Sequence, residues 1–310
     1  MARNKKGVPV HGWLNLDKPL GLTSTQAIGR VRRLTNAQKL GHAGTLDPLA
    51  TGILPIALGE ATKTIPYAQD ADKVYRFTVQ WGAATNTDDK EGEVIATSDK
   101  RPARADIEAL LPRFTGDILQ TPPQFSAIKL DGERAYDLAR AGQAVDIKPR
   151  PVTVYSLHIV ESTENEAVFE MECSKGTYVR AVARDMGQIL GCYGHVTALR
   201  RLAVGGFTEE NAISLDVFEK MVQSAPADQV LLPVETVLDD IPALAMTDGE
   251  ISRIRQGQTL KFMSRPDYNR LVAAGVDDAT DLVLAVGGNK PLAILEKQGI
   301  ELHPIKVFNL

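Results

Sequence analysis

The chain has 310 residues, of which 44% are hydrophobic and 24% are charged, and this balance predicts a globular protein of about two domains. No apolar run approaches the ~20 residues of a membrane-spanning helix, and the basic segment 1–6 is not followed by the apolar stretch of a secretory signal. The two cysteines, Cys173 and Cys192, lack a metal-ligand spacing and are too few for a disulfide scaffold. We therefore expect a protein of the reducing cytosol with no membrane contact.

The charge is distributed unevenly around a net value of −4. Residues 1–70 hold nine Lys or Arg against four Asp or Glu, whereas residues 208–310 hold nine against sixteen. A positive N-terminal part would suit an RNA backbone. A solvated basic helix face would explain the same charges equally well, so charge alone leaves both readings open.

Hydrophobic periodicity predicts a mixed α+β fold. Segment 12–19 is typical of a short strand that ends at a turn, and Thr23 is a candidate N-cap for a helix that runs to about residue 34. Residues 74–81 alternate, with Tyr75, Phe77, Val79 and Trp81 on one face. Further helices are predicted at 105–114, 136–141, 178–190 and 214–222, and further strands at 152–160, 167–173, 282–286, 291–295 and 304–308.

Two features of this pattern concern the larger organisation. The helix at 178–190 places Val179, Val182, Met186 and Ile189 on one apolar stripe, and residues 152–173 form a predicted hairpin. Polar sequence at 224–227 and 239–240 predicts a boundary. We therefore expect one domain over 1–235, with an insertion at about 120–150, and a small strand-rich domain over 240–310.

The segment 41–55 carries the strongest chemical signal. It contains three glycines, two prolines and a single carboxylate, Asp47, which directly precedes Pro48. Glycine permits backbone angles that other residues resist, whereas proline fixes its own φ and restricts the residue before it. A loop constrained in this way can hold a site carboxylate in one place. A tight surface turn with a solvated aspartate is the alternative for a segment of this composition.

Segment 41–55 resembles the signature loop of the pseudouridine synthases, and in detail that of the TruB family, the tRNA pseudouridine-55 synthases. The resemblance extends over about residues 10–205. It is carried by further segments at 16–24, 59–63, 73–76, 173–180 and 195–201, and by 126–129 with Gly132 and Tyr136. It implies a pseudouridine synthase fold with a mixed, largely antiparallel sheet flanked by helices, followed by a PUA-like RNA-binding domain.

The resemblance also implies roles for individual residues. Asp47 is implied as the catalytic nucleophile, and Arg180 as its bidentate partner, which would oppose the cost of burying a charged carboxylate. Tyr75 is implied to stack on the flipped target base and to take part in proton removal at C5. Without Asp47, the alternating strand would make Tyr75 a core aromatic, and Arg180 would be a surface cation.

Other residues complete the implied site. Tyr178 and Leu199 would form pocket walls, and His42 would fill the space that flipped bases leave in the RNA loop. Lys18 and Lys63 would be phosphate contacts or loop supports. The reaction is an isomerisation, so we expect no cofactor and no metal, and the expected partner is the T arm of tRNA, bound by a monomer without an obligatory protein partner.

Two other classes of function remain open. An RNA-binding or RNA-folding factor could act on tRNA independently of catalysis. A glycosidase-type hydrolase would usually need two carboxylates, and Asp17 and Glu60 are the nearest to Asp47 in the sequence.

Overall fold

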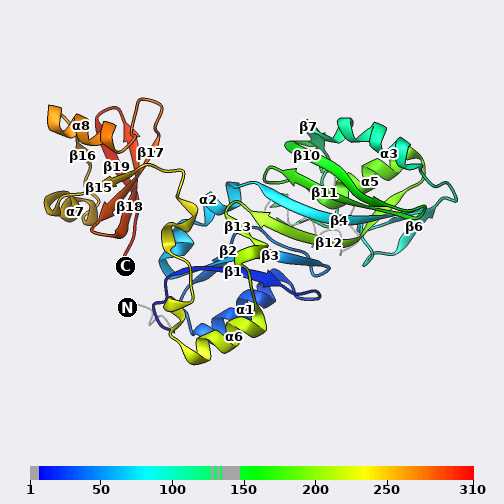
Figure 1. Cartoon of the computed structure of the whole chain (residues 1–310), viewed down its shortest axis with the longest axis horizontal. Helices are drawn as coiled ribbons and strands as arrows, with labels where there is room; N and C mark the ends of the chain where they lie inside the picture. Colours follow the sequence, from blue (N-terminus) through cyan, green and yellow to red (C-terminus); the bar gives the residue numbers. More distant parts are fainter. Residues whose placement is uncertain (1–6, 127–128, 131–132, 135–146) are drawn as a thin grey trace.

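The computed structural model describes residues 7–126, 129–130, 133–134 and 147–310. Two main β-sheets organise these residues, one of ten strands and one of five. Figure 1 shows an elongated molecule in which the small sheet lies at one end, joined to the large sheet by the chain that follows α6 (Leu215–Ser224). The fold is therefore α+β, as predicted.

The large sheet has the order β14-β1-β3-β12-β4-β11-β10-β7, with β2 beside β3 and β13 beside β12. Its strands are β1 (Gly12–Lys18), β2 (Leu40–His42), β3 (Ala50–Leu58), β4 (Lys73–Trp81), β7 (Gly116–Gln120), β10 (Arg150–Ser162), β11 (Glu166–Cys173), β12 (Gly194–Val204), β13 (Phe207–Thr208) and β14 (Ile213–Ser214). Only the β1–β14 and β3–β12 pairs are parallel among these strands. The mixed, largely antiparallel sheet and the hairpin of β10 and β11 confirm the prediction.

The alternation in β4 follows the predicted faces. Phe77, Val79 and Trp81 are almost fully buried, whereas Arg76 and Gln80 are exposed. Because side chains of a strand point alternately to its two faces, one face of β4 packs into the core below the sheet.

The parallel pairing of β3 with β12 brings the loop before β3 close to the middle of β12. At this contact Gly52 lies opposite Arg201 and has a φ of +97°. A Cβ atom here would lie 2.1 Å from the carbonyl oxygen of Arg201, so only glycine permits the two strands to approach this closely.

Two separate groups of helices pack on the large sheet, α1 with α6 and α5 with α3. α1 (Ser24–Thr35) packs against α6 beside β1, and α5 (Val179–Leu190) packs on β12 and β4 with α3 (Arg104–Leu110) nearby (Figure 1). Thr23 caps α1 through a capping box with Gln26, which confirms the predicted start of this helix. The predicted helix at 105–114 is α3 followed by the 3₁₀ turn η2 (Leu111–Phe114).

The apolar stripe of α5 is shorter than predicted. Val179, Val182 and Met186 are buried, whereas Ile189, the residue before the end of the helix at Leu190, is 45% exposed. Gly191, whose φ is +68°, caps the helix.

The five-stranded sheet forms a separate, β-rich C-terminal part. Its order is β15 (Ala243–Ala245), β17 (Leu282–Gly287), β18 (Lys290–Gln298), β19 (Glu301–Val307) and β16 (Leu260–Lys261). The three strands predicted here correspond to β17, β18 and β19. Two helices that the sequence analysis did not predict, α7 (Asp248–Arg255) and α8 (Arg265–Ala273), accompany the sheet, and each begins with a capping box, a signal present in the sequence.

The C-terminal sheet is packed against the large sheet through a shared apolar cluster. Trp13 and Ile53 from the large sheet share this cluster with Leu284, Ile294 and Phe308. A second core belongs to the C-terminal part alone. The predicted division between 235 and 240 lies next to Val234 and Leu238, which both belong to the shared cluster, and it stays a prediction.

The remaining elements are short. They are η1 (Gly59–Lys63), α2 (Ile65–Asp70), β5 (Ala83–Thr85), β6 (Val94–Thr97), β8 (Lys129–Leu130), β9 (Glu133–Arg134), η3 (Glu209–Asn211), η4 (Ala227–Gln229) and η5 (Val234–Val237). The helix predicted at 136–141, and Gly132 and Tyr136 of the motif, lie outside the described residues.

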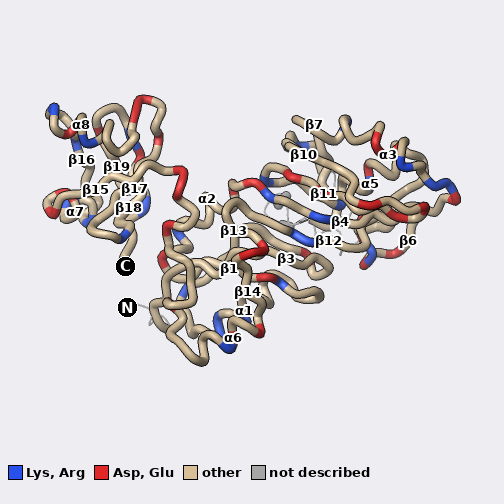
Figure 2. The backbone as a smooth tube through the Cα atoms, viewed as in Figure 1, with Lys and Arg blue, Asp and Glu red and all other residues tan. Residues whose placement is uncertain are grey.

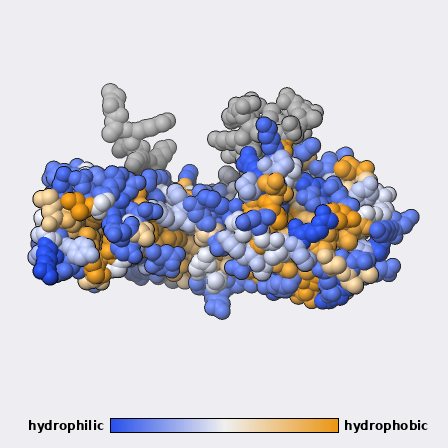
Figure 3. Space-filling model, turned by 90° about the horizontal axis from the view of Figure 1, so that it is seen from above, coloured by the Kyte–Doolittle hydropathy of each residue, from blue (hydrophilic) through white to orange (hydrophobic). Residues whose placement is uncertain are grey.

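The surface seen from above is mostly hydrophilic and carries scattered apolar patches (Figure 3). Within the described part of the chain, no helix is long and apolar enough to cross a bilayer. Figure 2 marks basic residues on β4 and β12, and acidic residues along the chain that leads into the C-terminal sheet. The positive charge therefore lies close to the carboxyl-bearing loop before β3.

Candidate active site

A pocket of about 300 Å³ opens where the loop between β2 and β3 meets the first turn of α5. Five residues with predicted roles line it: Asp47, Tyr75, Tyr178, Arg180 and Leu199. They come from the loop, from β4, from the N-terminus of α5 and from β12. The sheet order, rather than nearness in the sequence, brings them together.

Helix α1 holds the Asp47 loop in place through two hydrogen bonds between Ser24 and the backbone of Leu46. The Ser24 hydroxyl, which is buried in the first turn of that helix, donates to the carbonyl of Leu46 at 3.0 Å and accepts from its N–H at 2.8 Å. The carbonyl of Asp47 accepts from Ala50 N–H at 3.0 Å. These bonds fix the backbone, while the Asp47 side chain remains 38% exposed toward the pocket.

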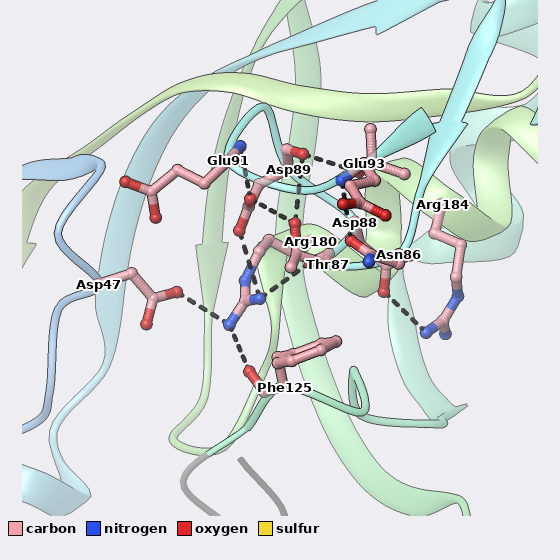
Figure 4. A network of polar contacts seen from close by, with 11 residues as sticks. Asp47, Asn86, Thr87, Asp88, Asp89, Glu91, Glu93, Phe125, Arg180 and Arg184 are labelled. Atoms are coloured by element: carbon pink, nitrogen blue, oxygen red, sulfur yellow. Dashed lines mark hydrogen bonds and ion pairs between the residues drawn. The ribbon is translucent and has the colours of Figure 1, made fainter. Parts of the chain in front are cut away.

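Arg180 lies beside this carboxylate (Figure 4), and its side chain is almost completely buried. Its Nη2 lies 2.9 Å from Oδ2 of Asp47 and donates to the carbonyl of Phe125 at 2.9 Å. Its Nη1 donates to the carbonyl of Thr87 at 2.9 Å and lies 3.3 Å from Oδ2 of Asp89. The predicted bidentate pairing with Asp47 is therefore wrong, because the second nitrogen of the fork is used by the 87–89 loop.

Asp89 is the residue of this network that the sequence analysis missed. Its side chain is 4% exposed, and its Oδ1 accepts from the Thr87 hydroxyl at 2.6 Å and from Glu91 N–H at 3.0 Å. Its segment, 88–93, has the composition of a polar turn. Nothing in the local sequence distinguishes a buried aspartate from a solvated one in such a turn, because the burial comes from α5 and β12.

Tyr75 and Tyr178 form aromatic walls of the pocket. Burial raises the pKa of Tyr75, and the charge and hydrogen bond of Arg201 oppose this shift only in part, so the hydroxyl is protonated at neutral pH. Burial also raises the pKa of Tyr178. The side-chain amide of Gln120 forms two hydrogen bonds with the backbone of Tyr178. Its oxygen accepts from the N–H of Tyr178 at 2.7 Å, and its nitrogen donates to the carbonyl of Tyr178 at 3.2 Å.

Two family models match the chain and together cover residues 32–239. The model described as TruB family pseudouridylate synthase (N terminal domain) matches residues 32–179, and the tRNA pseudouridylate synthase B C-terminal domain matches 180–239. The chain is 54% identical over 311 residues to tRNA pseudouridine synthase B of Caulobacter vibrioides, with 100% of each chain covered. The chain belongs to the TruB family of pseudouridylate synthases.

Other relatives agree with this membership, which makes the protein an enzyme. The tRNA pseudouridine synthase B of Bradyrhizobium diazoefficiens is 54% identical over 307 residues, covering 97% of this chain and 86% of the relative. A chain in the crystal structure of a Cbf5-Nop10-Gar1 complex has the same fold, with a TM-score of 0.72 at 23% identity over 100% of this chain and 91% of that one. A chain of an H/ACA RNP bound to a substrate RNA containing 2'-deoxyuridine gives a TM-score of 0.70 at 21% identity, with coverages of 100% and 92%.

Three residues expected in the TruB-type site do not line the pocket. Lys18 is fully buried and donates to the carbonyls of Pro19 and Leu22 at 3.0 and 2.7 Å, so it supports a loop and cannot reach a phosphate. Burial lowers the pKa of its ammonium to about 8. His42 lies in β2 outside the pocket lining, and burial lowers its pKa, which favours the neutral imidazole.

Lys63 serves the C-terminal part instead of the pocket. It pairs with Glu60 at 2.5 Å and donates to the carbonyl of Val307, the last residue of β19, at 2.6 Å. The same Glu60 oxygen accepts from Asn309 N–H at 2.9 Å. Lys63 is therefore part of a polar contact that fixes the C-terminal strand to η1.

Two buried cations of the pocket had no predicted role although both lie in the motif segments. Arg201 donates to the carbonyl of Ile53 at 2.7 Å and to that of Gly44 at 3.1 Å, which ties the loop before β3 to β12. The ammonium of Lys73 donates to the carbonyls of Gln69 and Ala71 at the end of α2, and burial lowers its pKa to about 8. Among the residues that the structure describes, no group of His, Cys, Asp or Glu is placed to hold a metal ion.

Proposed function

We propose that this enzyme converts uridine 55 in the T loop of tRNA to pseudouridine, with Asp47 as the nucleophile. The observation that carries this proposal is the carboxylate of Asp47, which faces a small pocket and lies 2.9 Å from the buried guanidinium of Arg180. The relatives named tRNA pseudouridine synthase B support tRNA as the substrate.

The reaction needs one carboxylate and no redox partner. The N1–C1′ bond breaks, the uracil turns, and a C5–C1′ bond forms, while the proton of C5 is lost and N1 gains one. Asp47 could attack C1′, add to C6 of the base, or remove a proton from the sugar to give a glycal. Each route requires an ionised carboxylate next to the base, and the positive charge of Arg180 balances that charge in the partly buried site.

The pocket walls suit a base that has left its stack. A pocket of about 300 Å³ lies at the lower end of the range for small-ligand sites, so it suits a single nucleotide better than a helix. Tyr75 and Tyr178 offer aromatic surfaces, and Leu199 offers an apolar one. Flipping a base costs a few kcal/mol, which such stacking and edge hydrogen bonds offset.

The test uses an unmodified tRNA transcript and its isolated T-arm stem-loop, without metal or nucleotide. Pseudouridine is mapped by carbodiimide labelling and primer extension for the wild type, for Asp47→Asn, and for Asp216→Asn as an aspartate control on α6. We expect a single product at position 55 with the wild type and the control, and none with Asp47→Asn. A transcript with cytidine at position 55 should remain unmodified.

The other outcomes are equally informative. Product with Asp47→Asn would overturn the nucleophile assignment, and product at a different uridine would overturn the proposed site. Tight binding by the wild type without any product would favour a tRNA-binding or tRNA-folding factor whose action is independent of catalysis.

A further inference from the structure

A second arginine–aspartate contact lies one helical turn along α5 from Arg180. Arg184 donates from Nη1 to Oδ2 of Asp88 at 3.2 Å (Figure 4). It also donates from Nε to Oδ1 of Asp185 at 2.8 Å and from Nη2 to the carbonyl of Thr121 at 2.8 Å. The side chains of Arg184 and Asp88 are 19% and 13% exposed. Neither residue lines the pocket, so the proposed reaction gives the pair no direct role.

The two arginines of α5 make equivalent connections. Residues four apart lie on the same face of a helix, and both guanidiniums point to the same two neighbours. Each forms an ion pair with one carboxylate of the 87–89 loop, and each donates to one carbonyl of the 121–125 segment. Together they hold this loop and this segment against the helix that carries Arg180.

The backbone at Asp88 directs both carboxylates of the loop to this helix. Side chains of consecutive residues in an extended strand point to opposite faces. Asp88 has a φ of +61°, in the left-handed region that non-glycine residues rarely adopt, and the next side chain, Asp89, also faces α5. The loop is attached to β12 by a hydrogen bond of 3.1 Å from Val196 N–H to the carbonyl of Asp88. Backbone strain of this kind is found preferentially at functional sites.

Keeping the Asp88 carboxylate charged at this buried position costs free energy. Burial raises the pKa of Asp88 to about 6, and the opposing charges of Arg184 and Arg180 do not overcome this, while Asp185 adds to it. The charged form of Asp88 is therefore less favourable in the folded protein than in water. A buried pair with this property is better explained by the geometry that it imposes.

We propose that Asp88 and Arg184 are positioning residues that keep Arg180 between Asp89 and Asp47. The inference rests on the proposed function, because it assumes that the Asp47–Arg180 contact serves pseudouridine formation. The pair acts through the 87–89 loop and the 121–125 segment, both of which contact Arg180 as well.

The test compares Asp88→Asn, Arg184→Gln, the double variant and the conservative Arg184→Lys. Arg104→Gln is the matched control, since Arg104 forms an exposed pair with Glu108 on α3. Three quantities are measured for each full-length protein: the single-turnover rate constant at saturating enzyme, the Kd for the T-arm RNA, and the Tm. The rate is followed at whichever uridine the wild type converts.

We expect each single variant to slow the single-turnover step roughly 10- to 100-fold, as a small misplacement of a catalytic group does. The Kd should stay within about threefold and the Tm close to the wild type. The double variant should be no slower than the slower single variant, because the two residues act through one contact. Arg184→Lys should lose less than Arg184→Gln, and Arg104→Gln should have the wild-type rate.

Three results would overturn the proposal. They are wild-type rates in both single variants, losses of RNA affinity and Tm that account for the loss of rate, and effects that multiply in the double variant. A failure of the proposed function appears elsewhere, either as a product at another uridine of the wild type or as activity of Asp47→Asn. The pair is still tested in that case, because its effect on rate is measured at the uridine that is converted.

Discussion

Arg180 and Asp89 form an ion pair beneath the pocket, with 3.3 Å between Nη1 and Oδ2 and only 6% and 4% of their side chains exposed. Asp47, on the other side of the same guanidinium, is 38% exposed. The buried aspartate therefore anchors the arginine, and the more exposed one is the carboxylate that a substrate can reach. Asp47 and Asp89 both pair with Arg180, but only Asp47 is exposed enough to contact a substrate.

Asp89→Asn should slow the single-turnover reaction roughly 100-fold with little change in RNA affinity. Asparagine keeps the oxygen that accepts from Thr87 and Glu91, but it removes the negative charge that anchors Nη1 of Arg180. The measurement is the rate constant at saturating enzyme together with the Kd for the T arm. Asp117→Asn, at an exposed aspartate on β7, is the control, and a wild-type rate in Asp89→Asn would contradict the anchoring role.

Substitutions of Tyr75 should separate stacking from proton transfer. Because burial raises the pKa of its hydroxyl, Tyr75 is protonated in the free enzyme. It can take the proton from C5 of the base only if Arg201 stabilises its deprotonated form. Tyr75→Phe keeps the ring and should lose roughly 100-fold or more in rate if the hydroxyl transfers a proton. Tyr75→Leu should also weaken binding of the flipped base. Wild-type activity in Tyr75→Phe would leave Tyr75 with a stacking role alone.

The contact between Lys63 and Glu60 should stabilise the C-terminal part without serving the reaction. We expect Lys63→Met to lower the Tm by a few degrees and to leave the rate on the T-arm stem-loop unchanged. Burial alone would raise the pKa of Glu60, but the hydrogen bonds from Lys63 and from Asn309 N–H lower it below its ordinary 4.5.

A depressed carboxyl pKa contributes stability above the unfolded value and loses it as the pH falls through the folded value. The Tm difference between wild type and Lys63→Met should therefore be largest at neutral pH and shrink as the pH falls below the ordinary carboxyl value of 4.5. Lys261→Met, in the exposed pair with Glu301, is the control. A slower reaction on the T arm in Lys63→Met would restore a role for Lys63 in RNA binding.

Asp88→Asn should become stabilising relative to the wild type as the pH rises. The pKa of Asp88 is raised from 3.8 to about 6, so the folded protein binds more protons than the unfolded chain in this window and loses stability as the pH increases. The groups that face Asp88 are Arg180, Arg184 and Asp185 on α5 and Asp89 in its own loop. The neighbouring 121–125 segment carries no charged side chain.

Asparagine does not titrate, so the difference in the free energy of unfolding should shift by about 2 kcal/mol in favour of the variant between pH 4 and pH 7. Denaturant unfolding at both pH values measures this shift. An equal difference at the two pH values would show that Asp88 is charged at an ordinary pKa in the folded protein.

Much of the fold could be predicted from local patterns. The alternation in β4, the capping box of α1 and the periodicity of α5 depend on residues within one element, and these elements are present within one to two residues of the predicted bounds. Ile189 shows the limit of the method, because periodicity places it on the apolar stripe but the folded helix leaves it 45% exposed.

Site residues could be predicted where they occupy a defined position in a family motif. Asp47, Tyr75, Tyr178, Arg180 and Leu199 were all selected in the sequence, and all line one pocket. The two lysines could not be assigned in this way. Lys18 and Lys63 are cations in motif segments, and only their neighbours in three dimensions show that one supports a loop and the other binds the C-terminal strand.

The sequence by itself determined the α+β class, the order of most elements, the rigid loop around Asp47 and the resemblance to the TruB family, since each depends on residues that are close together in the chain. The tertiary structure decided that Arg180 divides its two nitrogens between Asp47 and the 87–89 loop, and that Asp88 and Arg184 form a second pair behind it. The physical reason is that burial and ion pairing arise between elements whose relative positions follow from the strand order, and no local pattern encodes that order.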